Sequence, residues 1–268
     1  MPEEKLACLP SGFQRVGDVI LLNLRPEVIP YASDIAFAVK ESVKGVKAVC
    51  RIEEIEGEAR MPKAELILGS DTITIHKENG CLYKLDAARI MFSKGNLAER
   101  GKMATLARSG EVVVDMFAGI GYFSLPIAIH AKPKAVYAIE INPLAFSYLK
   151  ENIRLNKVDG KVLPILGDCR KVNLGGIADR VVMGYLPGTA AYLPAAFKAL
   201  KPAGGVLHYH DTYSESELWD APIDELARQA ERNGFRLKQV LDKRIVKNYA
   251  PKVYHIVIDA QFETARPS

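Results

Sequence analysis

The chain has 268 residues, 49% of them hydrophobic, so it can bury one large core or a core with a smaller attached domain. The formal net charge of +4 permits an anionic partner without requiring one. No stretch approaches the roughly 18 uncharged apolar residues of a membrane span, and the N-terminus lacks the order of a signal peptide. The four cysteines form no C-x-x-C pair, which argues against a zinc ribbon or a disulfide scaffold. We therefore expect a cytoplasmic protein with reduced thiols.

The first 95 residues show short β-like runs separated by turns. These runs cover residues 18–24, 46–52, 64–69 and 71–80, and a helix-like stretch covers 31–43. Residues 53–58, Glu-Glu-Ile-Glu-Gly-Glu, are expected to form an acidic turn that would repel RNA. We predict a small N-terminal α+β domain over residues 1–95.

Strands and helices alternate after residue 96, where a helical stretch over 96–107 begins. We expect strands at 111–117, 134–141, 161–168, 178–185, 204–211 and 253–262, with helices at 122–131, 143–156, 191–202 and 222–234. This alternation predicts a Rossmann-like, doubly wound α/β domain with a parallel sheet over residues 96–268. Ligands bind such a sheet at the carboxyl ends of its strands.

Acidic residues stand at the ends of three successive predicted strands, at Asp115, Glu140 and Asp168. Gly119 and Gly121 follow the first strand and let the backbone turn sharply and approach a ligand, but the third glycine of a pyrophosphate-binding fingerprint is missing. A carboxylate at Glu140 can accept both hydroxyls of a ribose, and Asp168 suits an adenine amino group. The three acids favour S-adenosylmethionine over a dinucleotide, because a sulfonium nucleoside has no phosphate for them to repel.

Several longer segments resemble archaeal enzymes that modify the purine 3′ of the anticodon in tRNA. They are "NGCLYKLDAARIMFSKGNLAER", "VVVDMFAGIGYFSLPIA", "ENIRLNKV", "ADRVVMGY", "HYHDT" and "KNYAPKVYHIVID". Two branches share that ancestry: a guanine N1-methyltransferase and a wybutosine-pathway aminocarboxypropyltransferase.

The stretch Met183-Gly184-Tyr185 distinguishes the two branches. The methyltransferases have an Asn-Leu-Pro or Asn-Pro-Pro type motif there, whereas this stretch and "LHYHDT" look like the aminocarboxypropyl branch. This resemblance implies transfer of the 3-amino-3-carboxypropyl group of S-adenosylmethionine to carbon 7 of 4-demethylwyosine. The acceptor is position 37 in the anticodon loop of tRNA(Phe), and methylthioadenosine is released. No obligate protein partner is evident.

The resemblance also carries over cofactor-binding residues. It adds Ser93 and Arg100 to Glu140 and Asp168, and Arg100 is chemically suited to the carboxylate of the methionine arm. The family commonly has asparagine where this chain has Cys169, and the backbone N–H of Cys169 is available for a cofactor contact there. No residue is assigned a catalytic role.

Candidate residues for contact with the tRNA lie on the fourth and fifth predicted strands of this sheet. Tyr185 could stack on an extruded base, and His208 and His210 share one face of their strand for base contact or structure. Asp211 points to the opposite face and a metal needs a third ligand, so no metal site is predicted. Basic residues over 238–252 could meet phosphates or form an ordinary solvated face.

Three other functions stay open on the sequence. A tRNA guanine-37 N1-methyltransferase would use the same pocket and act on unmodified tRNA. A non-catalytic tRNA-binding protein would bind tRNA in a salt-sensitive way without binding S-adenosylmethionine. A small-molecule methyltransferase would leave the N-terminal domain and the basic C-terminal stretch hard to explain.

Overall fold

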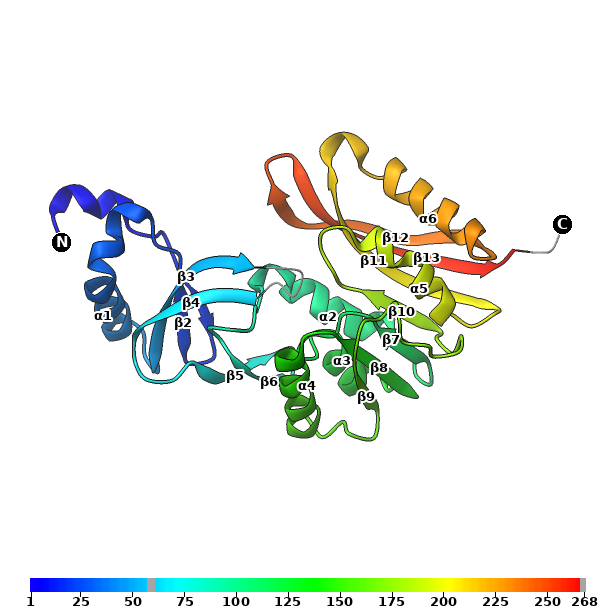
Figure 1. The fold of residues 1–268 in the computed structure, drawn as a ribbon, viewed down its shortest axis with the longest axis horizontal. Helices are drawn as coiled ribbons and strands as arrows, with labels where there is room; N and C mark the ends of the chain where they lie inside the picture. Colours follow the sequence, from blue (N-terminus) through cyan, green and yellow to red (C-terminus); the bar gives the residue numbers. More distant parts are fainter. Residues whose placement is uncertain (57–60, 266–268) are drawn as a thin grey trace. The chain divides into compact units, whose positions relative to one another are not determined.

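The computed structural model describes residues 1–56 and 61–265. It divides the chain into two compact units, Met1–Lys94 and Gly95–Ser268, each with its own sheet and its own buried core (Figure 1). Within the described residues, no helix combines the length and the apolar character needed to cross a membrane.

The first unit is a small α+β unit, as predicted. Its four-stranded sheet has the order β1-β2-β3-β4, and β5 and β6 form a separate hairpin. The strands are β1 Gln14–Val16, β2 Val19–Leu22, β3 Ala48–Glu56, β4 Met61–Leu68, β5 Ile73–Glu78 and β6 Cys81–Asp86, and the helices are η1 Glu3–Cys8, η2 Pro26–Tyr31 and α1 Ala32–Ser42. Strand β2 is wholly buried, and α1 buries Ile35 and Ala36 in the same core. The expected acidic turn is not seen as such: Glu53–Glu56 belong to β3, and the rest of it lies outside the described residues.

The second unit contains a seven-stranded sheet with the order β12-β13-β11-β10-β7-β8-β9. Its strands are β7 Val112–Asp115, β8 Ala135–Glu140, β9 Val162–Leu166, β10 Arg180–Met183, β11 Gly204–Ser214, β12 Phe235–Ala250 and β13 Val253–Thr264. The chain moves outward from β7 to β9 and then returns to the other side of β7 with β10. The order therefore reverses between β7 and β10, and the carboxyl ends of these two strands flank the switch point where such sheets bind ligands.

The prediction of a parallel sheet is wrong at one strand. Strand β13 runs antiparallel to both β11 and β12. The sequence pattern does not predict strand β12, because charged residues interrupt its apolar ones, most of which are half-buried or exposed. The basic stretch at 238–252 is therefore largely the edge strand of the sheet.

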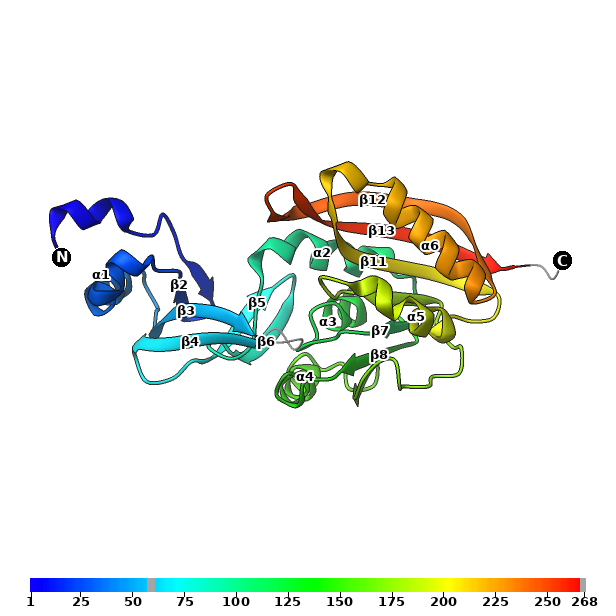
Figure 2. The same cartoon turned by 45° about the horizontal axis from the view of Figure 1, so that its top comes forward.

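Helices cover both faces of this sheet. They are α2 Leu97–Leu106, α3 Ser124–Pro126, the π-helix η4 Ile127–Ala131, α4 Pro143–Leu155, α5 Leu193–Ala199 and α6 Asp220–Arg232, with short 3-10 turns η3 Lys94–Asn96, η5 Thr189–Tyr192 and η6 Glu215–Glu217. Helix α2 packs on α3 and η4, whereas α5 and α6 pack together (Figure 2). The start of α4 is fixed by Asn142, whose side-chain oxygen accepts the N–H of Leu144 at 2.9 Å.

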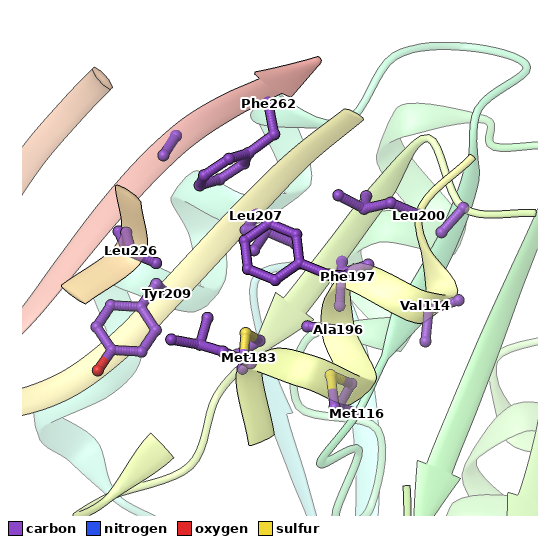
Figure 3. Close-up of a cluster of buried hydrophobic side chains, with 14 of the residues drawn as sticks. Val114, Met116, Met183, Ala196, Phe197, Leu200, Leu207, Tyr209, Leu226 and Phe262 are labelled. Carbon is purple, nitrogen blue, oxygen red and sulfur yellow. The ribbon is translucent and has the colours of Figure 1, made fainter. Parts of the chain in front are cut away.

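An apolar cluster packs strands of this unit against α5 and α6. Phe197 of α5 meets Phe262 of β13 edge to face at 5.0 Å and lies over the sheet with Leu207 (Figure 3). The cluster also includes Val114, the residue before the last of β7, and Met183, the last residue of β10. Packing there fixes the strand ends from which the candidate site is built.

Candidate active site

The loop after β7 requires its two glycines. Gly119 has φ +57° and Gly121 has φ +103°, a region that other residues rarely adopt. A Cβ on Gly121 would lie 2.7 Å from Cγ of Leu125, so the loop is also closely packed. Asp115 fastens this loop from beneath: it accepts the Ser124 hydroxyl at 2.7 Å and the Phe117 N–H at 3.3 Å. Burial raises the pKa of the fully buried Asp115 carboxyl to about 6. Its hydrogen-bond partners lie in the loop and at the start of α3.

Glu140 lies at the end of β8, next to the loop after β7 that contains Gly119 and Gly121, called the glycine loop below. One carboxylate oxygen accepts the N–H of Gly119 and the other accepts the N–H of Asn142, both at 2.7 Å. Burial raises the pKa of Glu140, and the two backbone N–H groups oppose that shift. Each carboxylate oxygen has further acceptor capacity, so the group can receive two hydroxyls in a fixed orientation. This geometry fits a ribose.

Arg100 lies on α2 and is 2% exposed. Its guanidinium carbon is 6.0 Å from the ring centroid of Tyr122 in the glycine loop. The helix therefore brings a buried cation beside the loop that Glu140 holds. Ser93 belongs to the first unit, and its predicted cofactor contact stays a prediction.

Asp168 and Cys169 follow β9, and their side chains lie in different environments. Asp168 is held by Arg170, whose Nη2 is 2.7 Å from Oδ2, and this hydrogen bond lowers the pKa of the carboxyl. The guanidinium of Arg170 also lies 5.0 Å from the ring centroid of Tyr192. The Cys169 side chain is 7% exposed within the apolar cluster, and burial raises the pKa of its thiol to about 12. A cofactor contact at this residue would therefore use its backbone.

The loop after β10 carries an aromatic side chain to the end of β7. The ring of Tyr185 stacks on that of Phe117 at 5.0 Å, and Tyr192 meets Phe117 edge-on at 4.9 Å. At the neighbouring position, a Cβ on Gly184 would lie 2.5 Å from Cε2 of Phe123. The ring of Phe123 fills the place where a polar side chain at 184 would begin.

Asp211 holds this loop in place, a role that the sequence pattern does not predict. Its carboxylate accepts the N–H of Gly188 at 2.8 Å, the N–H of Ala190 at 3.2 Å and the hydroxyl of Tyr209 at 2.8 Å. Asp211 is 4% exposed. Asp211 ends the predicted strand 204–211 and lies within β11, and the loop that it holds is some 20 residues away along the chain, so no local pattern indicates this role.

Both histidines of β11 are buried. His208 Nε2 lies 2.6 Å from Nη1 of Arg180, which can only donate, so Nδ1 carries the proton and donates to Asp259 at 2.6 Å. His210 Nδ1 lies 3.1 Å from Nε2 of His255, and burial lowers the pKa of His210 to about 3. Their predicted base contacts stay predictions. The described part of the chain contains no group of three or more His, Cys, Asp or Glu that could hold a metal ion.

Some basic residues of the stretch 238–252 form ion pairs within the protein. Arg244 donates to Glu99 and to Asp259, where the shortest contact to Asp259 is 2.6 Å. Its side chain is only 15% exposed. Arg244 therefore ties β12 to α2 and β13, whereas Lys243 and Lys252 are exposed.

Two family models match the chain. One is described as the TRM5/TYW2 methyltransferase domain and matches residues 74–238, and the other is described as the TYW2 N-terminal domain and matches residues 1–72. The chain belongs to the TRM5/TYW2 methyltransferase family.

Relatives in this family cover nearly the whole chain. The tRNA(Phe) (4-demethylwyosine(37)-C(7)) aminocarboxypropyltransferase of Methanocaldococcus jannaschii is 46% identical over 254 residues, 94% of this chain and 98% of the relative. The tRNA (guanine(37)-N(1))-methyltransferase Trm5b of Pyrococcus abyssi is 39% identical and is matched over 97% of this chain and 77% of its own length. The crystal structure of Pyrococcus horikoshii TYW2 in complex with MeSAdo has a TM-score of 0.88 and 43% identity, covering 99% of this chain and 96% of that one.

Proposed function

We propose that this protein transfers the 3-amino-3-carboxypropyl group of S-adenosylmethionine to carbon 7 of 4-demethylwyosine at position 37 of tRNA(Phe). Methylthioadenosine is the other product. The observation that carries this conclusion is the 46% identity to an aminocarboxypropyltransferase along almost the full length of both chains. The methyltransferase relative is less similar and longer than this chain. The related structure with bound MeSAdo, the methylthioadenosine product, supports the same reaction.

We assign residues 96–268 as the catalytic domain. The donor binds there, at the carboxyl ends of the strands. Glu140 receives the ribose hydroxyls because both of its oxygens are already oriented by backbone N–H groups. Arg100 pairs with the carboxylate of the amino acid arm, and Gly119 lets the donor approach the backbone. The electrophilic sulfonium supplies the reactive carbon.

Three further residues complete the proposed donor site. Asp168 faces the adenine amino group, Cys169 offers its backbone N–H, and Ser93 is a further donor contact. Asp115 contributes through the loop that it fastens, since its observed hydrogen bonds are to Ser124 and Phe117.

The acceptor is the anticodon loop of the tRNA, in the cytoplasm. Tyr185 contacts the tricyclic base from the loop after β10, where its ring already stacks on Phe117. His208 and His210 of β11 contribute to the part of the site that binds the base. The N-terminal domain positions the tRNA.

The test uses S-adenosylmethionine labelled either in the methyl group or in the carboxyl carbon. Each is incubated with tRNA(Phe) carrying guanosine or 4-demethylwyosine at position 37. We expect carboxyl label to enter only the 4-demethylwyosine tRNA, with release of methylthioadenosine. Methyl label in the guanosine tRNA would instead establish the N1-methyltransferase, and tRNA binding without either transfer would establish a non-catalytic binding protein.

A further inference from the structure

The side chain of Tyr122 lies close to the groups assigned to the amino acid arm and to the ribose of the proposed donor. The Arg100 guanidinium carbon is 6.0 Å from its ring centroid. The ring also lies against the α-carbon of Gly119, since a Cβ built there would be 2.7 Å from Cδ2 of Tyr122. The N–H of Gly119 in turn donates to Glu140 at 2.7 Å.

The backbone fixes this placement. The N–H of Tyr122 donates to the carbonyl of Ala118 at 3.2 Å, closing the turn in which Gly119 has φ +57°. Burial raises the pKa of the Tyr122 phenol, and the negative charge of Glu140 raises it further while Arg100 opposes the shift. The ring therefore remains a neutral aromatic group close to both a cation and an anion.

The chemistry of the donor gives this position a meaning. S-adenosylmethionine runs from the ribose through the sulfonium to the α-carboxylate. If the ribose is at Glu140 and the carboxylate at Arg100, the sulfonium and its three carbons lie between them, beside Tyr122. An aromatic ring attracts a desolvated cation, and its bulk limits how the sulfonium can rotate.

We propose that Tyr122 is a specificity-determining residue that orients the sulfonium so that the γ-carbon, and not the methyl carbon, faces the acceptor base. This inference rests on the proposed function and goes beyond it by naming the residue that decides which C–S bond breaks. In the favoured reaction, carbon 7 forms a bond to the γ-carbon, the γ-carbon–sulfur bond breaks with its electron pair on sulfur, and the proton of carbon 7 leaves to solvent. Methyl transfer breaks the methyl–sulfur bond instead and leaves S-adenosylhomocysteine.

The test compares Tyr122→Leu, which removes the ring and keeps a smaller apolar side chain, with Tyr122→Phe, which removes only the hydroxyl. The two labelled donors and 4-demethylwyosine tRNA are used, and label is counted in the tRNA fraction with both nucleoside products. Donor affinity is measured by calorimetry. Tyr137→Leu is the matched control, because Tyr137 is a half-buried tyrosine of β8 packed on the apolar cluster.

We expect Tyr122→Leu to weaken donor binding about tenfold, which corresponds to removing one desolvated cation–π interaction. Its share of methyl transfer should rise at least tenfold over that of the unaltered protein. Tyr122→Phe and Tyr137→Leu should keep the original partition. Where Tyr122→Leu does not fold by circular dichroism, Tyr122→Met replaces it.

A folded Leu or Met variant with an unchanged partition between the two transfers would overturn the proposal, even if donor affinity falls. Failure of the proposed function is seen separately, because the unaltered protein would then transfer no carboxyl label.

Discussion

Replacing Glu140 by glutamine keeps the length of the side chain and removes one acceptor oxygen. Both carboxylate oxygens now lie 2.7 Å from a backbone nitrogen, one from Gly119 and one from Asn142. The amide NH₂ of glutamine must therefore face one of these N–H donors. We expect the variant to lose one backbone hydrogen bond and one hydrogen bond to the ribose.

The variant should lose more affinity for the donor than stability of the fold. A hydrogen bond to a charged group contributes about 1.5–3 kcal/mol, so the dissociation constant of S-adenosylmethionine should rise roughly 10- to 150-fold. Stability should change less, by about 1 kcal/mol, because the neutral amide avoids the desolvation that raises the pKa of the Glu140 carboxyl.

Calorimetry with S-adenosylmethionine measures the affinity, and urea unfolding measures the stability. Glu231→Gln, on the exposed face of α6, is the control and should change neither quantity. A folded Glu140→Gln protein that binds S-adenosylmethionine as tightly as the unaltered protein would refute the ribose assignment.

Three other predictions concern pH, the loop after β10 and the tRNA. Burial lowers the pKa values of His210 and His255 from 6.5 to about 3, so below pH 6.5 the unfolded chain takes up protons that the folded chain does not. The free energy of unfolding should therefore fall as pH drops, by about 2 kcal/mol for each histidine at pH 5. Urea unfolding measures this fall in the unaltered protein and in His255→Asn, and a fall of equal size in both would contradict the prediction. Asp211→Asn should raise the KM for tRNA and leave donor affinity unchanged, because the amide cannot accept every hydrogen bond of the carboxylate; an unaltered KM would show that the loop tolerates this change. Replacing Lys243 and Lys252 by alanine should reduce the salt slope of tRNA binding by roughly 0.7–0.9 for each phosphate that the protein no longer neutralises, and an unchanged slope would place the tRNA elsewhere.

The sequence alone predicted the α/β class and the strand ends that carry Asp115, Glu140 and Asp168. This was possible because a buried parallel strand is a short β-branched run, and because glycines such as Gly119 and Gly121 mark the turn that follows it. The resemblance added Arg100, which local patterns would read as an ordinary helix arginine.

Tertiary structure decided what each of these side chains faces. Asp115 and Glu140 look alike in the sequence, yet one is bound wholly within its loop and the other has backbone N–H groups on both oxygens. Arg244 lies in a stretch that suggests phosphate binding, but it forms ion pairs with Glu99, 145 residues away.

The position of Tyr122 beside Arg100 likewise depends on where α2 packs, whereas its contact with Gly119 comes from the local turn. Such long-range contacts leave no periodic trace in the chain, because they arise only when separate elements pack together. The sequence determined which elements form and which chemical groups end them, and packing determined which of those groups meet.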